Sequence, residues 1–255
     1  MELFKPDELS LGTAVSKLQA EIHSLGIADI RVSKEVAELE VAANQAGKAN
    51  FVGEHFRRTL NTFAPDHVLW IGLYDENDRC VVTCGSRLDY ASGWSLQHLI
   101  QQYFERVFQS EDGEPVSLSK ASVSCVSTFT GKSVYVGEGH VNKGYRGRNL
   151  LALAQRLLII SAYVRWDPEL IYGFMRPDKI FNNYHLDWGY SVAKPTAIIW
   201  EKPPAEASLH DLYFVGLGVE GVRRLCSDPL LVGLSRSRES SRTESLHREG
   251  FAVGQ

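Results

Sequence analysis

A short turn between two apolar segments concentrates the residues with the clearest chemical potential. Residues 142–149 read Asn-Lys-Gly-Tyr-Arg-Gly-Arg-Asn. Its three cations add positive charge, and its two glycines let the backbone approach a ligand closely or adopt positive φ. Backbone N–H groups ahead of a helix bind anions, because the unpaired amides and the helix dipole point at the ligand. The turn therefore predicts a site for a phosphorylated ligand. An ordinary loop with solvated cations is the alternative interpretation.

Two strand-like segments and one long apolar segment must position this turn. Residues 133–141 and 169–175 have the composition of strands, and residues 149–164 are apolar on most sides of a helix. A strand, a basic turn and a buried helix in this order place residues 142–149 at the amino-terminal end of the helix.

The strand before the turn carries two titratable residues, Glu138 and His140. Because side chains alternate along a strand, we expect Val134, Val136, Glu138 and His140 to share one face. Both titratable residues are candidate bases, acting directly or through water. A salt-bridged or solvated glutamate and a packed histidine are the alternative interpretation.

Periodicity and turn residues divide the rest of the chain into further elements. The predicted helices are residues 10–25, a segment following Ser33, and residues 50–63, 95–109 and 177–188. The predicted strands are residues 27–32, 67–75, 80–89, 190–200 and a segment near 211–217. Residues 67–75 and 80–89 are separated by turn-forming residues, so we expect a hairpin.

The composition excludes several classes of protein. The chain has 255 residues, with 27 Lys plus Arg against 31 Asp plus Glu, a net charge of −4 and a pI near 6.1. At 44% hydrophobic and 23% charged, it is typical of a folded globular protein. The charge balance lacks the basic footprint of a nucleic-acid-binding protein, so we expect no nucleic-acid partner.

Cysteine usage and hydropathy predict a cytoplasmic protein without a metal site. Four cysteines (Cys80, Cys84, Cys125 and Cys226) form no C-x-x-C pair, and we expect reduced thiols. The first residues include acidic side chains and no apolar run, so no secretory signal is expected. The longest apolar run, residues 150–164, is shorter than the roughly 20 residues needed to cross a bilayer, so no membrane span is expected.

The order of these elements, together with the segment VYVGEGHVNKGYRGRNLLALAQRL, resembles the GNAT N-acetyltransferase superfamily over about residues 27–200. The resemblance implies an α/β (α+β) fold with a mixed, mostly antiparallel central sheet flanked by helices. Splayed parallel strands in its middle would be residues 133–141 and 169–175. The implied organisation is a helical extension at 1–26, an acyltransferase domain at 27–220 with an insertion at about 91–130, and a polar tail at 221–255.

The resemblance also implies acetyl-CoA or another acyl-CoA as co-substrate, without a metal. The family pattern Arg/Gln-x-x-Gly-x-Gly/Ala falls on residues 146–151, where Asn149 and Leu151 replace both glycines. Leu151 puts a side chain where the diphosphate would approach, so a donor other than acetyl-CoA is a further expectation. The implied binding residues are Val141, Lys143, Gly144, Tyr145, Arg146, Gly147, Arg148, Asn149 and Asp178.

Acyl transfer to an amine requires a base for the nitrogen and an acid for the leaving thiolate. Glu138 and His140 are the candidate bases. Many relatives place the acid four residues before the Gly of a Gly-aromatic pair; counting back from Gly189 reaches His185, with Tyr184 adjacent. The implied acceptor is a small-molecule amine or a protein. Candidate residues for its pocket are Phe51, Phe56, Trp70, Trp94, Tyr103 and Phe104.

Two other functions fit the same residues. The replaced glycines are compatible with a non-catalytic binding or regulatory module of the same fold. Alternatively, Lys143, Arg146 and Arg148 would dock an acidic acyl carrier protein in a synthase that makes a signal molecule or lipid. A homodimer is a possible assembly in each case.

Overall fold

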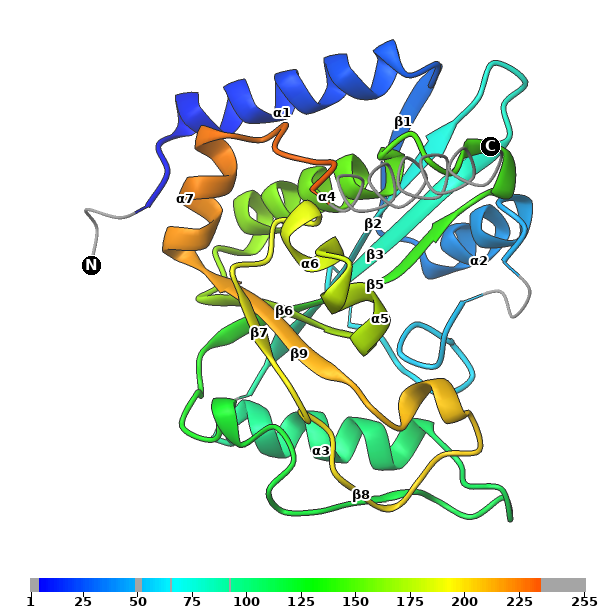
Figure 1. The fold of residues 1–255 in the computed structure, drawn as a ribbon, viewed down its shortest axis with the longest axis vertical. Helices are drawn as coiled ribbons and strands as arrows, with labels where there is room; N and C mark the ends of the chain where they lie inside the picture. Colours follow the sequence, from blue (N-terminus) through cyan, green and yellow to red (C-terminus); the bar gives the residue numbers. More distant parts are fainter. Residues whose placement is uncertain (1–4, 49–51, 65, 92, 235–255) are drawn as a thin grey trace, which may run out of the picture.

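A seven-stranded mixed sheet organises the protein (Figure 1). The computed structural model describes residues 5–48, 52–64, 66–91 and 93–234. The strands, in their order across the sheet, are β1 (Asp29–Ser33), β2 (Val68–Tyr74), β3 (Cys80–Tyr90), β5 (Lys132–Val141), β6 (Leu170–Met175), β9 (Tyr213–Gly218) and β7 (Val192–Lys194). Neighbouring strands are antiparallel, apart from the parallel pair β5 and β6 in the middle. The predicted fold class is confirmed.

Helices cover both faces of this sheet. They are α1 (Glu8–Ser24), α2 (Val36–Gln45), α3 (Leu96–Val107), α4 (Leu150–Trp166), α5 (Pro177–Phe181), α6 (Tyr184–Asp187) and α7 (Val219–Ser227). In Figure 1, α1 and α7 lie together near α4, whereas α3 lies at the opposite end of the molecule beside the small sheet of β4 (Ser117–Leu118) and β8 (Trp200–Lys202).

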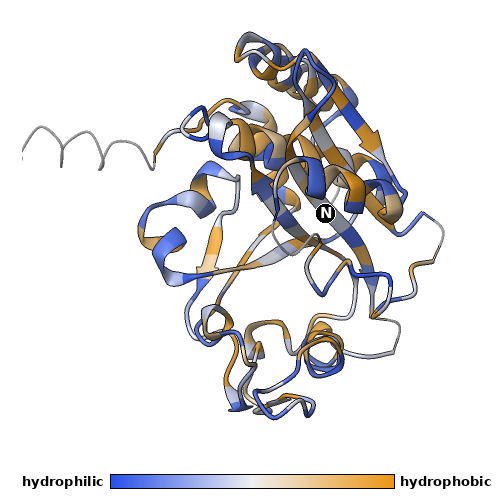
Figure 2. Cartoon of the chain, turned by 90° about the vertical axis from the view of Figure 1, so that its right-hand side faces the viewer, coloured by the Kyte–Doolittle hydropathy of each residue, from blue (hydrophilic) through white to orange (hydrophobic). Residues whose placement is uncertain are grey.

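Two hydrophobic clusters form because successive strand residues point to opposite faces. The first, here the α4 cluster, contains Val134 and Val136 of β5 with buried residues of α1, α4 and α7. The second, here the aromatic cluster, contains Trp70, Phe104 and Tyr172 with buried residues of α2 and α3. Figure 2, coloured by hydropathy, shows hydrophobic and hydrophilic residues together on the helices and strands. Helix α4 is apolar nearly all round because the sheet covers one side of it and α1 and α7 contact others.

Most predicted elements occur within a few residues of their expected bounds, including the hairpin β2–β3, but the helix predicted at 50–63 is wrong. Residues 52–64 form turns closed by short-range bonds, such as Phe56 N to Gly53 O and Leu60 N to Arg57 O. The Asn61 side-chain amide donates to the carbonyl of Glu54, which a continuing helix would pair with the backbone amide of residue 58.

Two more predicted elements are interrupted. The helix predicted at 177–188 divides into α5 and α6, because Asn183 adopts a left-handed conformation with φ of 60°. The strand predicted at 190–200 divides into β7 and β8, which belong to different sheets. Pro195 and Thr196, which has φ of 50°, lie between them.

The termini of the described chain add to the core. Residues Ala14, Leu18 and Ile22 of α1 and Val222, Leu225 and Cys226 of α7 belong to the α4 cluster. The domain bounds predicted at 26 and 220 remain predictions, and residues 235–255 of the predicted tail lie outside the described residues. The four cysteines are free thiols. No helix in the described ranges is long and apolar enough to span a membrane.

Candidate functional site

The parallel strands β5 and β6 separate partway along their length. They pair at Ser133 with Leu170, Val134 with Ile171, and Tyr135 with Tyr172, and the pairing ends there. Strand β5 nevertheless continues to Val141 and β6 to Met175. From Val136 onward, β5 is paired with β3 alone, so one edge of its backbone is turned toward a space between the strands. The predicted splay of these two strands is confirmed.

A β-bulge reverses the alternation of side chains in the part of β5 that extends beyond its pairing with β6. Glu138 has φ of 56°, and the register with β3 shifts between Thr83 and Gly85. The Glu138 carboxylate accepts a hydrogen bond from Gly53 N at 2.7 Å and forms an ion pair with Lys48. It therefore lies on the side of the aromatic cluster. The expectation that Glu138 and His140 share a face with Val134 and Val136 is wrong, because the extra residue of the bulge turns the following side chains over. Val141 packs against the α4 cluster, and the neighbouring His140 reaches Ala46 at the end of α2 instead.

His140 follows the bulge and is held in one tautomer. Its Nε2 lies 3.1 Å from the carbonyl oxygen of Ala46, which only accepts hydrogen bonds, so Nε2 carries the proton and Nδ1 keeps its lone pair. Burial lowers the pKa of His140, and the charges of Lys48 and Arg146 lower it further, against the opposing hydrogen bond to Ala46. The imidazole is neutral at pH 7 and can accept a proton at Nδ1.

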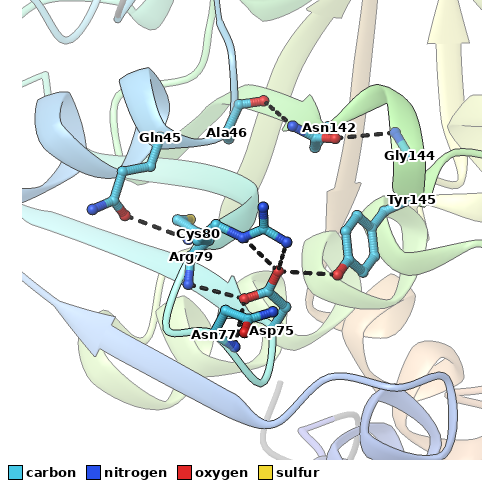
Figure 3. Close-up of polar contacts among 9 residues, drawn as sticks. All are labelled: Gln45, Ala46, Asp75, Asn77, Arg79, Cys80, Asn142, Gly144 and Tyr145. Atoms are coloured by element: carbon cyan, nitrogen blue, oxygen red, sulfur yellow. Dashed lines mark hydrogen bonds and ion pairs between the residues drawn. The ribbon is translucent and has the colours of Figure 1, made fainter.

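Hydrogen bonds from two other elements hold the turn after β5 in place (Figure 3). Asn142 donates to Ala46 O at 3.2 Å and accepts from Gly144 N at 3.0 Å. The Tyr145 hydroxyl donates to the Asp75 carboxylate at 3.2 Å, in the loop between β2 and β3. Burial alone would raise the pKa of Asp75, but hydrogen bonds from the residues around it, Arg79 foremost, lower it overall. The carboxylate therefore stays ionised and anchors the turn.

The end of the turn presents backbone amides. Gly147 and Asn149 have φ of 79° and 58°, so Asn149 adopts the left-handed conformation that glycine would otherwise provide. Leu153 N bonds to Asn149 O, which leaves the amides of residues 150–152 ahead of the first helical bond of α4. The first turn of α4 holds no acidic residue. The positive end of the helix dipole is therefore available to an anion.

A cavity of about 440 Å³ joins these features. Its walls are the end of β5, the turn, the start of α4, and helices α5 and α6. The lining residues are Gly139, His140, Val141, Tyr145, Arg146, Gly147, Asn149, Leu150, Leu151, Ala152, Lys179, Tyr184, Asp187 and Trp188. A second groove, of about 760 Å³ between β1 and α2, is lined by Trp70, one of the residues proposed for the acceptor pocket, but by none of the predicted catalytic or donor-binding residues.

The cavity brings together seven of the predicted site residues and separates them from the others. His140, Val141, Tyr145, Arg146, Gly147, Asn149 and Tyr184 line it. Lys143, Gly144 and Arg148 are exposed and outside the lining. Asp178 is exposed and ion-paired with Arg176 and Lys179. Glu138, whose carboxylate contacts Lys48 and Gly53 N, is also outside the lining.

The two arginines of the turn are not equivalent. Arg146 lines the cavity, whereas the Arg148 guanidinium lies 5.1 Å from the centre of the Tyr145 ring in a cation–π contact. Tyr184 and His185, the two candidate acids, also differ. Tyr184 lines the cavity with Lys179 Nζ 4.7 Å from its ring centre, whereas His185 is outside the lining. Burial lowers the pKa of His185 despite the opposing charge of Asp187.

Sequence reasoning missed Gly139, Lys179, Asp187 and Trp188. Lys179 is one residue from Asp178, and Trp188 precedes the Gly-aromatic pair, so position relative to the motifs was the available signal.

Of the aromatic residues proposed for the acceptor, Phe56, Trp70 and Phe104 are buried and Trp94 is 52% exposed. Tyr103 is partly buried, and Phe51 lies outside the described residues. Among the residues that the structure describes, no group of three or more His, Cys, Asp or Glu could hold a metal ion.

Known proteins resemble this chain in structure alone. No protein-family model and no curated protein matches the sequence. The aminoglycoside acetyltransferase AAC(6')-Ib, solved with coenzyme A and kanamycin, is 9% identical, with a TM-score of 0.45 over 77% of this chain and 98% of that one. FeeM, an N-acyl amino acid synthase from uncultured soil microbes, is 13% identical, with a TM-score of 0.43 over 75% and 90%. A GNAT-family acetyltransferase from Bacillus anthracis is 10% identical, with a TM-score of 0.39 over 76% and 97%. The likeness is one of fold.

Proposed function

We propose that this protein is an N-acyltransferase that moves an acyl group from a CoA-type thioester to an amine. One observation carries the proposal. The end of β5 that is not paired with β6 and the start of α4, where the amides of residues 150–152 precede the first helical bond, line the same cavity. A separated strand pair offers backbone hydrogen bonds to an extended arm, and a helix start offers them to phosphate groups. A thioester of a phosphorylated carrier has both parts.

The residues of the cavity fit such a donor. Arg146, Lys179 and the amides of residues 150–152 would hold the diphosphate. Leu151 is partly buried and lies beside Gly139, so its side chain forms an apolar wall and does not fill the cavity. The bound thioester supplies an activated acyl carbonyl.

The proposed reaction forms a C–N bond and breaks the C–S bond of the thioester. His140 accepts the proton that the amine loses, because its Nδ1 is neutral and free of the Ala46 contact. Tyr184 donates a proton to the departing sulfur. Both carboxylate oxygens of Glu138 are engaged, by Lys48 and by Gly53 N, so Glu138 positions the bulge. The acceptor is an amine of a small molecule or protein. The acyl carrier protein and the homodimer remain predictions.

Titration of CoA into matched arginine variants tests the proposal. We expect Arg146→Ala to weaken CoA binding about tenfold, or 1.4 kcal/mol, because Arg146 lines the cavity. Arg148→Ala should change it less than about twofold, because that side chain stacks on Tyr145. Isothermal titration calorimetry measures both constants.

Equal losses in the two variants would contradict the placement of the diphosphate at this cavity. A wild-type protein that binds neither CoA nor an acyl-CoA would overturn the enzymatic proposal. The non-catalytic module would then be the better interpretation of the fold.

A further inference from the structure

The wall of the cavity contains one acidic side chain that the proposed reaction does not use. Among the described residues that line the cavity, Asp187 alone carries a carboxylate, and it is 2% exposed. A carboxylate repels a diphosphate, so holding the donor does not explain its presence. Its Oδ1 instead accepts a hydrogen bond from the backbone amide of Leu234 at 2.9 Å. Asp187 therefore ties the cavity wall to the segment that follows α7.

This segment, residues 228–234 and here the α7 extension, also contacts α4. In Figure 1 it is drawn in orange and runs from α7 back toward α6. The Arg156 guanidinium of α4 donates to the carbonyls of its first two residues, at 3.1 and 3.2 Å. A Cβ atom at Gly233 would lie 3.3 Å from Asn149 Nδ2, so the extension also passes beside the start of α4. It is thus fixed to α4 at two places and to α6 at Asp187.

Helix α6 depends on these contacts for its position. It has four residues, Tyr184–Asp187, and begins after Asn183, which adopts a left-handed conformation. A single helical turn is not stable by itself. Arg156 donates to the carbonyls of the last two residues of α6, at 2.9 and 2.6 Å, and the amide of Leu234 donates to its one buried carboxylate. The α7 extension and Arg156 together hold this turn against α4.

We infer that the α7 extension positions the Tyr184 hydroxyl for proton transfer to the departing sulfur, through the hydrogen bond between Leu234 N and Asp187 Oδ1. The inference rests on the proposed function and makes Asp187 a positioning residue. Tyr184 precedes Asp187 by three residues on one helical turn, and both side chains line the cavity. Proton transfer requires hydrogen-bond distance between the phenol and the sulfur. A small displacement of α6 therefore slows this step and leaves the donor contacts of Arg146 in place.

Two substitutions at Leu234 form a matched pair, because Leu234→Pro removes the amide hydrogen and Leu234→Ala keeps it. Each protein is prepared with 3-fluorotyrosine, and the fluorine NMR signal of Tyr184 is identified by its absence from Tyr184→Phe. We expect Leu234→Pro to shift or broaden this signal and Leu234→Ala to leave it in place. Asp187→Ala should reproduce the change, and Asp187→Asn should restore most of it, because the carboxamide oxygen still accepts the bond.

Hydrolysis of acetyl-CoA, in which water replaces the amine, supplies a rate through the thiol that it releases. We expect Leu234→Pro to lower kcat about tenfold and to keep KM within about twofold. The melting temperature of each variant is measured alongside, and the Asp187 pair carries the test if Leu234→Pro does not fold.

An unchanged Tyr184 signal in Leu234→Pro would overturn this inference, while CoA binding by the wild type still supported the proposed function. Equal changes in Leu234→Pro and Leu234→Ala would also overturn it, as would a rise in KM at constant kcat. The fluorine signal requires neither turnover nor ligand. It therefore reports on the α7 extension separately from any failure of the wild type to bind CoA, which would overturn the proposed function.

Discussion

The two ends of β5 belong to one strand but have different neighbours. At the paired end, residues 132–135 have a strand on each side, and Ser133, Val134 and Tyr135 are buried. At the open end, β3 is the one neighbouring strand: Gly137, His140 and Val141 pair with it, and residues 137–141 are partly exposed or exposed. Backbone polar groups at the paired end are used by the sheet, whereas one edge of the open end is available to a ligand. Where β6 no longer pairs with β5, the end of β5 lines the candidate site instead of the core.

The groups that compensate a buried arginine also differ between the two ends. At the paired end, Arg87 and Asp89 form an ion pair in which each side chain is 5% exposed. The Tyr172 hydroxyl donates to Asp89 at 2.7 Å, and Ser133 Oγ donates to the Asp89 carbonyl at 3.2 Å. Burial alone would lower the pKa of Arg87, but the Asp89 charge raises it above its ordinary value. Near the open end, the guanidinium of Arg156 contacts backbone carbonyls, and burial lowers its pKa to about 10.

The largest effect is expected from Asp89→Ala. Removing this carboxylate leaves the charge of Arg87 buried and the Tyr172 hydroxyl without its acceptor. We expect a loss of about 3–5 kcal/mol in the free energy of unfolding, measured by urea denaturation. The double variant Arg87→Leu with Asp89→Leu should recover most of this loss, because no unpaired charge remains buried at this position. A small loss in Asp89→Ala would show that the paired end does not depend on the ion pair.

A smaller effect is expected from Arg156→Met. This side chain joins the carboxyl ends of α6 and α7 to α4, so it supports the cavity wall at Asp187 and Trp188. We expect a loss of about 2 kcal/mol in unfolding free energy, together with weaker CoA binding. Arg165→Met, on the same helix, removes a surface ion pair with Asp66 and should change stability little. A loss of stability without weaker CoA binding would show that Arg156 does not support the wall of the cavity.

The smallest effect is a pH dependence that distinguishes two histidines. Burial lowers the pKa of His55 well below its ordinary value, and the charges of Arg87 and Arg106 lower it further. Its ring packs against Tyr135, with 4.7 Å between ring centres. Because the pKa of His55 is lower in the folded protein than in the unfolded chain, the unfolded chain takes up the proton at a higher pH. The stability present above about pH 6.5 is therefore lost as pH falls, by up to about 1.4 kcal/mol per pH unit for one group.

Urea denaturation between about pH 7.5 and 5.5 measures this loss. We expect His55→Gln to flatten the profile more than His140→Gln, because the pKa of His55 is lowered further and His140 keeps a hydrogen bond to Ala46. A wild-type profile that does not decline below about pH 6.5 would contradict the neutral state of His55 in the folded protein.

The sequence predicted the elements around the site better than the site itself. The hairpin β2–β3 and helix α4 have long apolar patterns bounded by turn residues, and both were predicted within a few residues. The bulge at Glu138 could not be inferred, because the surrounding residues continue a strand-like pattern through it. The segment 52–64 contains aromatic residues at helix-like spacing, but Phe56 is buried by turns that other elements hold in place.

The same distinction holds for the two basic side chains of the turn. Arg146 and Arg148 are two residues apart and chemically identical, so their sequence context gave them one role. Only the folded chain brings Tyr145 under Arg148 and opens the cavity beside Arg146.

Local patterns were sufficient to predict most of the strands, the buried helix and the basic turn, because periodicity reports which side of a segment is buried and which residues end it. The arrangement of the strands in a mixed sheet was implied by the family resemblance. The end of the β5–β6 pairing, the reversal at Glu138 and the composition of the cavity were decided by tertiary structure. They depend on the packing of segments that are far apart in the chain, and periodicity within one segment carries no information about that packing.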